Sequence, residues 1–172
     1  MSTSGLDGFD QHILSVLQTE GRISNADLAE RIGLSPTPCL RRVKTLENQG
    51  IILGYRADLA PTSIGLLLTV MVGVRISVHR EEQTSAIQEA FKALPEVVSC
   101  HLVSGETDYL LEVVVPDLQA YERFLVGKLL KFAEIKDVRS SFVIRTVKNR
   151  APFSLAHLGK EGGIIPPCQY DI

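Results

Sequence analysis

Two short stretches, each with helix start and stop signals, follow one another directly and constrain the fold of this chain most strongly. The second, Ser35–Gly50, begins with a serine whose hydroxyl can cap the first turn, then a proline at the first helical position. It ends with a glycine placed to leave the helix in a left-handed conformation. Leu40, Val43 and Leu46 recur at three-residue spacing, which predicts a short helix with one apolar face and an opposite face of cations and hydroxyls.

The first stretch predicts another helix immediately before this one. Ser24 and Asp27 form a capping-box-like pattern, and Gly33 ends the helix. Two short helices joined by a tight glycine turn are the plan of a helix-turn-helix, whose second helix enters the major groove of DNA. The local charge agrees: from Ser35 to Arg56 four cations face Glu47 alone, a net charge of +3 in a chain whose total is −2. The pattern alone also allows an ordinary helix pair in a helical core.

The residues of this region resemble a known family. The DNA-binding end of the Lrp/AsnC family of prokaryotic transcription regulators is similar to GRISNADLAERIGLSPTPCLRRVKTLENQGII, and the effector domain of that family is similar to CHLVSGETDYLLEVVVPDLQAY. The resemblance extends from about Leu6 to Lys148. Double-stranded DNA is therefore an expected partner. The residues expected to contact it are Ser24, Asn25, Ser35, Thr37, Pro38, Arg41, Arg42, Lys44 and Thr45.

The remainder of the first sixty residues completes a small helical domain. Asp7 can cap a helix over residues 8–20. The apolar side of that helix is predicted to hold Phe9, Ile13, Val16 and Leu17. Residues 51–58 predict a short hairpin or wing with Gly54 at the bend, and residues 60–66 have the composition of a hinge. We therefore predict a helix-turn-helix domain, winged or not, over residues 1–59.

After the hinge the apolar spacing changes from helical to strand periodicity. The predicted order is strand, helix, strand, strand, helix, strand, over residues 67–78, 81–94, 97–104 and 108–115, from 117 onwards, and over 138–147. The order βαββαβ is ferredoxin-like, so the fold class is α+β. We expect the effector and oligomerisation domain over residues 67–150 and an extended tail over residues 151–172.

The two helices of such a domain cover one face of the sheet and leave the other bare. The bare face is predicted to carry Met71, Val103 and Val143, so we expect a sheet-to-sheet homodimer. One short reading helix also gives little affinity for DNA by itself, which again favours a dimer. The family resemblance implies that such dimers assemble further, into octamers or similar, through this domain.

A hairpin turn at Gly105 offers chemistry suited to a free amino acid. An open glycine turn exposes backbone N–H groups that can receive a carboxylate, and Asp108 can hold an ammonium group. Plain turn chemistry explains both residues as well. The resemblance implies that this hairpin lines an effector site between dimers, for leucine or another apolar amino acid. The carried-over residues are Leu102, Val103, Ser104, Gly105, Asp108, Leu118, Phe142, Val143 and Ile144.

Other kinds of function are not expected. Cys100 and His101 are neighbours on a predicted strand and point to opposite faces, so they cannot easily share a metal ion; we expect no metal and no cofactor. No nucleophile elbow is present, so an enzyme is not expected. The chain shows no membrane span or secretion signal, and three widely spaced cysteines indicate reduced thiols in a cytoplasm.

Two alternative functions remain open from the sequence. One is an enzyme or regulatory subunit of amino-acid metabolism built on the ferredoxin-like domain. The other is an architectural DNA-binding protein that responds to no effector. Binding to promoter DNA separates the first alternative from a regulator, and a response to a small molecule separates the second.

Overall fold

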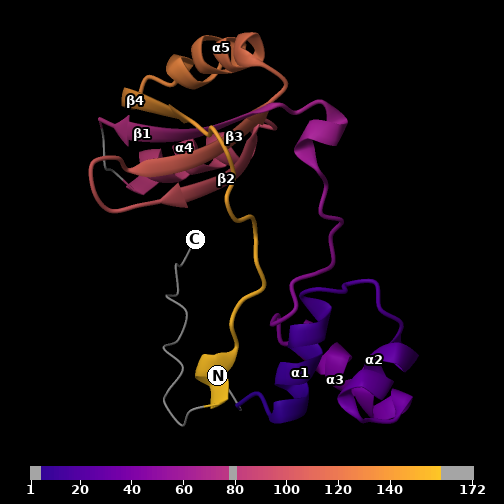
Figure 1. Cartoon of the computed structure of the whole chain (residues 1–172). Helices are drawn as coiled ribbons and strands as arrows, with labels where there is room; N and C mark the ends of the chain where they lie inside the picture. The colour runs from indigo at the N-terminus through magenta and orange to yellow at the C-terminus, as the bar shows by residue number, and fades with distance from the viewer. Residues whose placement is uncertain (1–4, 78–80, 160–172) are drawn as a thin grey trace. The chain divides into compact units, whose positions relative to one another are not determined.

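The computed structural model describes residues 5–77 and 81–159, which form two compact units (Figure 1). The first unit contains the chain up to Ala57 together with the chain from Lys148 onwards, and the second unit is Asp58–Val147. The chain therefore leaves the first unit, builds the second and returns to the first. The described part of the tail expected over residues 151–172 is grouped with the helical unit.

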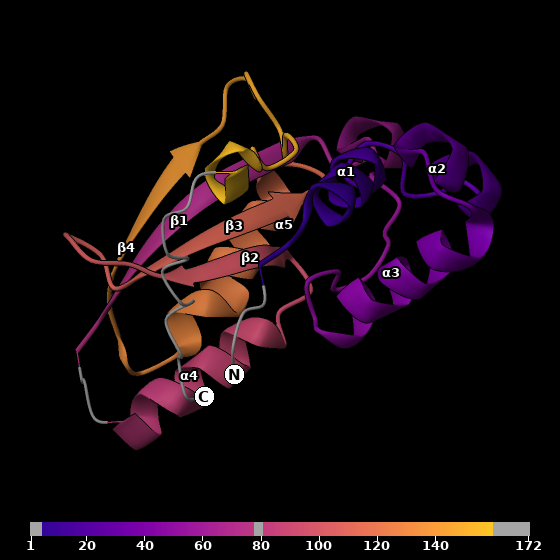
Figure 2. The same cartoon turned by 90° about the horizontal axis from the view of Figure 1, so that it is seen from below.

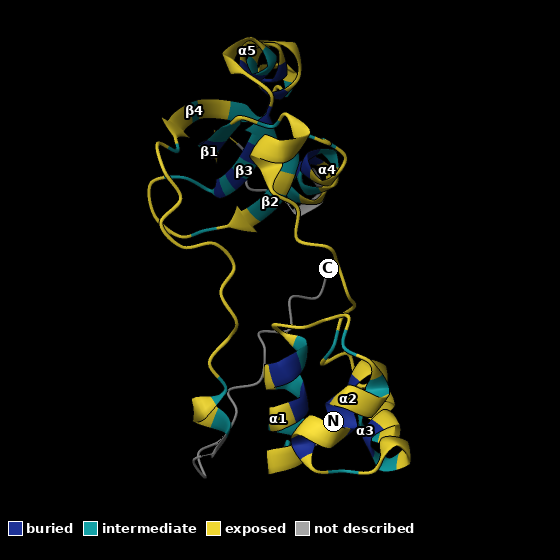
Figure 3. Ribbon diagram, turned by 45° about the vertical axis from the view of Figure 1, so that its right-hand side comes forward, coloured by how far each residue is buried: buried dark blue, intermediate teal, exposed yellow. Residues whose placement is uncertain are grey.

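Three helices build the first unit: α1 (Gly8–Leu17), α2 (Asn25–Ile32) and α3 (Pro36–Asn48). Asp7 and Asp10 form a reciprocal capping box on α1, and Ser24 caps α2. Gly33 and Gly50 take the left-handed conformation predicted for them, with φ of 72° and 69°. The core between the helices consists of Ile13, Val16, Leu28, Ala29, Ile32, Cys39 and Leu46 (Figure 3). The predicted helix-turn-helix is thus present.

The inner face of α3 differs from the predicted one. Leu40 is 43% exposed, whereas Cys39 is fully buried. The inward positions are therefore Cys39, Val43 and Leu46, and the helix is rotated by part of a turn from the predicted orientation. Phe9 was also predicted to face inward but is 42% exposed, and its ring packs under the Arg42 guanidinium, 5.4 Å from ring centre to carbon.

Two local predictions for this unit were wrong. Ser35 stands at the N-cap of α3, but its side chain makes no capping hydrogen bond. Instead the Asn25 amide donates to the carbonyl of Pro36 at 2.9 Å and ties the starts of α2 and α3 together. Residues 51–58 contain no strand, so the predicted hairpin is absent there. The Tyr55 hydroxyl donates to Glu47 at 3.1 Å, which holds this segment against α3 rather than letting it turn back on itself.

The second unit is an antiparallel sheet in the order β2-β3-β1-β4. Its strands are β1 (Leu68–Ile76), β2 (Val97–Leu102), β3 (Tyr109–Val115) and β4 (Ile135–Phe142). The helices α4 (Glu81–Lys92) and α5 (Leu118–Gly127) connect β1 to β2 and β3 to β4 (Figures 1 and 2). This is the predicted βαββαβ order. Short 3-10 turns occupy Pro61–Ile64, Leu129–Lys131 and Ala156–Gly159.

One face of the sheet forms the core with the two helices. Val70, Val72 and Val74 of β1 are fully buried, with alternate residues of β3 beside them. Phe91 of α4 and Phe124 of α5 pack onto the same face. The intervening positions, such as Met71 and Glu112, are only partly buried and form the open face of the sheet. The predicted division into a covered and a bare face is therefore present.

The last strand begins and ends earlier than the predicted 138–147. β4 pairs with β1, and Phe142 already lies opposite Val70, near the start of that strand. Val143 donates one more backbone bond, to Thr69, and beyond it there is no strand left to pair with. Ile144 is consequently 99% exposed. The length of β1 set this boundary, which an apolar pattern in the sequence could not reveal.

Candidate DNA-binding and effector surfaces

The exposed face of α3 carries cations and hydroxyls. Thr37, Arg41, Lys44 and Thr45 are all exposed. Arg41 and Lys44 make no ion pair within the described residues, so their charges are available to phosphates or base edges. The Thr45 hydroxyl donates to the carbonyl of Arg41 at 2.9 Å and keeps its lone pairs free to accept. Asn48 is exposed on the same side, and the sequence-based site did not include it.

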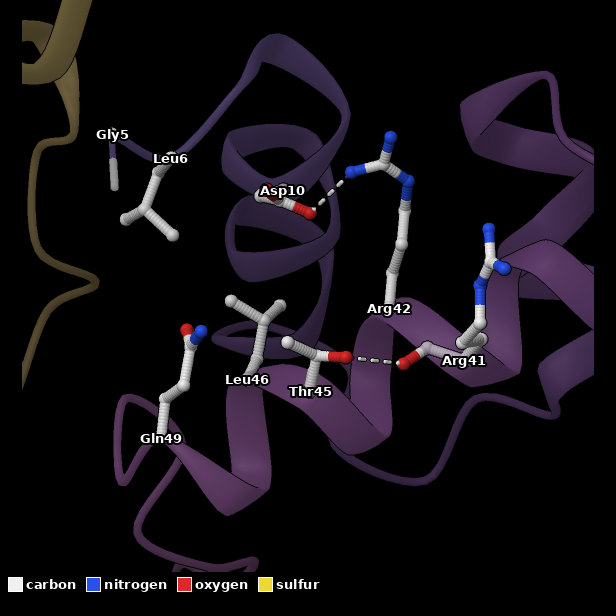
Figure 4. A pocket seen from close by; sticks show the side chains of 8 residues that line it. All are labelled: Gly5, Leu6, Asp10, Arg41, Arg42, Thr45, Leu46 and Gln49. Atoms are coloured by element: carbon white, nitrogen blue, oxygen red, sulfur yellow. Dashed lines mark hydrogen bonds and ion pairs between the residues drawn. The ribbon is translucent and has the colours of Figure 1, made fainter. Parts of the chain in front are cut away.

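Arg42 has a different environment from its neighbour Arg41. Its guanidinium forms ion pairs with Asp7 and Asp10, both at 2.8 Å. Figure 4 shows Arg42 turned toward Asp10 while Arg41 points away from that pair. The backbone N–H of Asp10 lowers the pKa of Asp7, and the Arg42 guanidinium lowers it further. Arg42 therefore fastens the start of α1 to α3, and its charge is already balanced inside the domain.

A hollow of about 330 Å³ lies beside this ion pair (Figure 4). It is lined by Gly5, Leu6, Asp10, Arg41, Arg42, Thr45, Leu46 and Gln49. Its acidic and basic groups are satisfied by each other, apart from Arg41 at its rim. The hollow therefore adds no separate binding chemistry to the exposed face of α3.

The other residues predicted to contact DNA have different surroundings. Ser24 accepts from the backbone of Asp27 at 3.2 Å and donates to its carboxylate at 2.7 Å, so this side chain caps α2. Asn25 bridges to Pro36, as described above, and its amide oxygen is buried without a partner. Ser35 is exposed at the turn, and Pro38 is half-buried. The turn residues thus hold the two helices at a fixed angle, while the α3 residues project outward.

The hairpin between β2 and β3 folds over the open face of the sheet. Gly105 has φ of 128°, a conformation that other residues rarely adopt. A methyl group added to Gly73 of β1 would come within 2.7 Å of the Thr107 side chain, so only glycine lets the hairpin lie this close. Glu106 forms an ion pair with Arg139 of β4. Contacts to two strands thus fix the position of this turn.

Asp108 has a structural role at the end of this hairpin. Its backbone N–H donates to the carbonyl of Val74 at 2.9 Å, and its carboxylate accepts from the N–H of Ile76 at 2.8 Å. One carboxylate oxygen is thus used where the pairing of β1 with β4 shifts register. The other oxygen accepts no hydrogen bond from the described residues and is the atom that could receive an ammonium group.

The structure does not bring all the predicted effector residues together in one chain. Leu102, Val103, Ser104, Gly105 and Asp108 lie at the hairpin end of the sheet, beside Ile76 of β1. Phe142 lies opposite Val70, six positions back along β1, which is about 20 Å at the rise of a strand. Leu118, Val143 and Ile144 belong to this second group.

The second group forms an open, apolar surface. Phe142 is 47% exposed, and its ring meets the Tyr121 ring edge-on, with ring centres 5.6 Å apart. A shallow hollow of about 600 Å³ is lined by Phe142, Val143, Ile144, Arg145 and Val147. Such an uncovered apolar surface can supply the wall of a site whose polar half lies on another chain.

Metal chemistry and membrane insertion find no support in the residues described. Within residues 5–77 and 81–159, no three histidine, cysteine or acidic side chains gather as they would around a metal ion. The same residues contain no helix long and apolar enough to cross a bilayer. Burial raises the pKa of the free Cys39 and Cys100 thiols above the ordinary value, so neither is an activated nucleophile.

Comparison with known proteins matches both units. Residues 6–52 match a family model described as winged helix-turn-helix DNA-binding, and residues 69–153 match the Lrp/AsnC ligand binding domain. The leucine-responsive regulatory protein of Escherichia coli is 44% identical over 143 residues, which are 83% of this chain and 87% of that protein.

Solved structures give the same result. A transcriptional regulator from Neisseria meningitidis, solved as a complex with L-methionine, superposes with a TM-score of 0.85 at 40% identity and covers 89% of this chain and 99% of its own. An AsnC family transcriptional regulator from Agrobacterium tumefaciens gives 0.83 at 38% identity, with coverage of 88% and 98%. The chain therefore belongs to the Lrp/AsnC family of transcription regulators, with its DNA-binding helix-turn-helix and its ligand-binding domain in one polypeptide.

Proposed function

We propose that the chain is a sequence-specific DNA-binding regulator whose assembly and operator affinity respond to an apolar amino acid. The DNA contacts are assigned to the exposed face of α3, with Arg41 and Lys44 as the free cations and Thr37 and Thr45 near the groove floor. Ser24, Asn25 and Arg42 act indirectly, because their side chains hold α1, α2 and α3 in place.

The effector site is proposed to form between chains. The observation that carries this is the division of the candidate residues into two groups at opposite ends of the sheet. The hairpin group offers backbone N–H groups and the Asp108 carboxylate, while the Phe142 group offers an apolar wall. A complete site requires the hairpin of one chain to meet the Phe142 surface of another.

The relatives suggest which amino acids to test first. The similar Neisseria meningitidis regulator was solved with L-methionine, and the Escherichia coli relative is named for its response to leucine. Both amino acids have long apolar side chains that suit the surface around Phe142. The open face of the sheet, with Met71, Val103 and Val143, is the proposed dimer contact, and dimers associate further into an octamer or similar assembly. Catalysis plays no part in this function. The free thiols of Cys39 and Cys100, the cysteines among the described residues, suit a cytoplasmic location.

The proposal is tested by linking ligand, assembly and DNA. Repeated selection from random duplex DNA should yield roughly palindromic sites with half-sites about 34 Å apart. Calorimetric titration with L-leucine and L-methionine, light scattering and DNA titration are then run on the wild type and on D108N. Asparagine can still accept from the N–H of Ile76 but carries no charge for the ammonium group.

The wild type should shift both its oligomer distribution and its DNA affinity when the amino acid binds, because a ligand acts only through a preference between states. D108N should bind the amino acid weakly and keep effector-free DNA binding. Unaltered amino-acid affinity in D108N would place the effector site elsewhere. Binding of DNA with no sequence preference would favour the architectural alternative.

A further inference from the structure

A separate hollow lies in the second unit, at the end of the sheet where β1 begins. It encloses about 470 Å³, within the roughly 300–1,000 Å³ that small-molecule sites occupy. Its apolar walls include Leu66, Val98, Val114 and Phe124, from the approach to β1, from β2 and β3, and from α5. Leu68 pairs with Val115 at this end, whereas the Gly105 hairpin precedes β3 at its opposite end. The Phe142 group lies toward the same end as the hollow, but none of its residues lines the hollow.

Three charged side chains line the same hollow: Glu96, Arg123 and Lys128. Lys128 donates to one carboxylate oxygen of Glu96 at 2.5 Å. The other oxygen of Glu96 is buried and has no hydrogen-bond partner in the described structure. Burial is the largest single influence and raises the pKa of Glu96, but the hydrogen bond and the charge of Lys128, together with a backbone hydrogen bond, leave the pKa below the ordinary value. Glu96 is therefore a carboxylate with a desolvated acceptor that lacks a donor.

An unsatisfied buried acceptor of this kind is costly unless a donor reaches it. The hollow beside Glu96 gives such a donor room to enter. Arg123 lies on α5, is exposed, and makes no ion pair within the residues described, so its planar fork is free to hold a second carboxylate. An acceptor for an ammonium, a donor for a carboxylate and apolar walls thus line one cavity.

We propose that this hollow is a second amino-acid site, in which Glu96 receives the α-ammonium group, Arg123 receives the α-carboxylate and Val98, Val114 and Phe124 surround an apolar side chain. The inference takes its ligand class from this charge pattern and deepens the proposed function by adding a site that one chain completes alone. Leu66 follows the Pro61–Ile64 turn in the predicted hinge, so a ligand here contacts the end of the segment that joins the two units.

The test is calorimetric titration of the full chain with L-leucine and L-methionine. The wild type should bind two equivalents per chain, and D108N should keep one of them. R123Q should bind the amino acid at this second site, the one that D108N keeps, with about ten- to a hundredfold lower affinity. That is the effect of one hydrogen bond between charged groups. K131Q is the matched control, because Lys131 is an exposed cation just after α5 that does not line the hollow.

A competing ligand tests the role of Glu96. The 2-oxo acid analogue of leucine keeps the carboxylate and the side chain but has no ammonium group, so it should bind D108N far more weakly than L-leucine does. E96Q removes the carboxylate and should reduce this preference, with thermal unfolding used to verify that the variant is folded. R123Q leaves the Glu96–Lys128 ion pair in place, so it tests the site without the risk of unfolding that E96Q carries.

Each result gives a decision. Two equivalents, one lost in D108N and the other in R123Q, support the inference. A single equivalent that D108N removes and R123Q leaves unchanged overturns it but leaves the proposed effector function intact. A wild type that binds neither amino acid overturns both, and equal losses in R123Q and K131Q show a general charge effect rather than a site.

Discussion

The two units place their candidate functional residues in opposite ways. In the helical unit, the exposed residues of α3 lie within one short stretch of sequence, from Thr37 to Asn48, on one helix face. In the sheet unit, the candidate effector residues come from β2, the hairpin, α5 and β4, and they fall at two ends separated by about 20 Å. One helix can present a complete binding surface from a single stretch of sequence. In the sheet unit, each end of the sheet collects residues from several stretches of the sequence.

The hydrophobic cores of the two units differ in size. Among the described residues, seven hydrophobic residues are buried in the core of the helical unit and thirteen in that of the sheet unit. A small domain buries a smaller fraction of its surface, so the loss of one buried side chain removes a larger share of its stability. DNA binding therefore depends on a unit with the smaller core, and the proposed assembly on the unit with the larger one.

The largest expected effect separates the two cores. L46A and L111A each remove a buried leucine, from α3 and from β3, and each should cost about 2–5 kcal/mol of the free energy of unfolding. L46A should abolish DNA binding while light scattering still shows the oligomer, and L111A should disrupt the oligomer. Loss of the oligomer in L46A would mean that the units do not divide these functions as the comparison suggests.

The next effect tests the position of the hairpin. G73A adds a methyl group where the Thr107 side chain lies, at 2.7 Å, and should cost about 1–3 kcal/mol through overpacking. T107S removes the methyl group of Thr107 that is closest to the added carbon. Amino-acid affinity and stability, measured by calorimetry and thermal unfolding, should fall in G73A and recover in the double variant G73A/T107S. Failure of the rescue would show that the hairpin is not held by this contact.

Neighbouring arginines on α3 provide a matched pair in the helical unit. R41A should weaken specific DNA binding by about 1–3 kcal/mol if Arg41 contacts guanine, or reduce the salt slope by about one if it contacts phosphate. R42A should instead lower the stability of the helical unit, because it releases Asp7 and Asp10. The measurements are a DNA titration at several salt concentrations and a thermal unfolding curve. The same salt slope and the same stability in both variants would contradict the distinction.

The smallest effect concerns the return of the chain to the helical unit. The Gln18 side-chain amide accepts from the N–H of Phe153 at 2.6 Å and donates to its carbonyl at 3.3 Å. Q18A should therefore destabilise this unit by about 0.5–1.5 kcal/mol, near the net value of one hydrogen bond, because the contact is exposed. The exposed Gln49 provides a control variant, Q49A, and the readout is thermal unfolding of both. Equal stability of Q18A and the wild type would mean that the returning segment does not stabilise the unit.

Local signals in the sequence predicted much of this architecture correctly. The caps at Asp7 and Ser24 and the left-handed glycines at Gly33 and Gly50 act within one turn of the chain, so the helix boundaries could be inferred from them. The alternation from Val70 to Ile76 and the Asp117 cap of α5 similarly gave the order of strands and helices. These signals depend on neighbours in sequence, which are visible without a structure.

The errors arose where neighbours in space decide the outcome. The rotation of α3 that buries Cys39 and exposes Leu40 depends on how three helices share one core. The end of β4 depends on the length of β1. The cap expected from Ser35 does not form, and the start of α3 is instead tied to α2 by a bond from Asn25 to the carbonyl of Pro36. The expected DNA contact of Arg42 stays a prediction, and it was made without the two aspartates, more than thirty residues away in the chain, that pair with its guanidinium.

The sequence by itself thus determined the helix-turn-helix, the βαββαβ order and the chemistry of the candidate residues, because caps, periodicity and charge are properties of the local chain. The tertiary structure alone decided which arginine is free, which effector residues share an end of the sheet, and that Glu96 and Arg123 line one hollow. The physical reason is that burial and ion pairing depend on distances between segments, and those distances exist only once the strands and helices have packed.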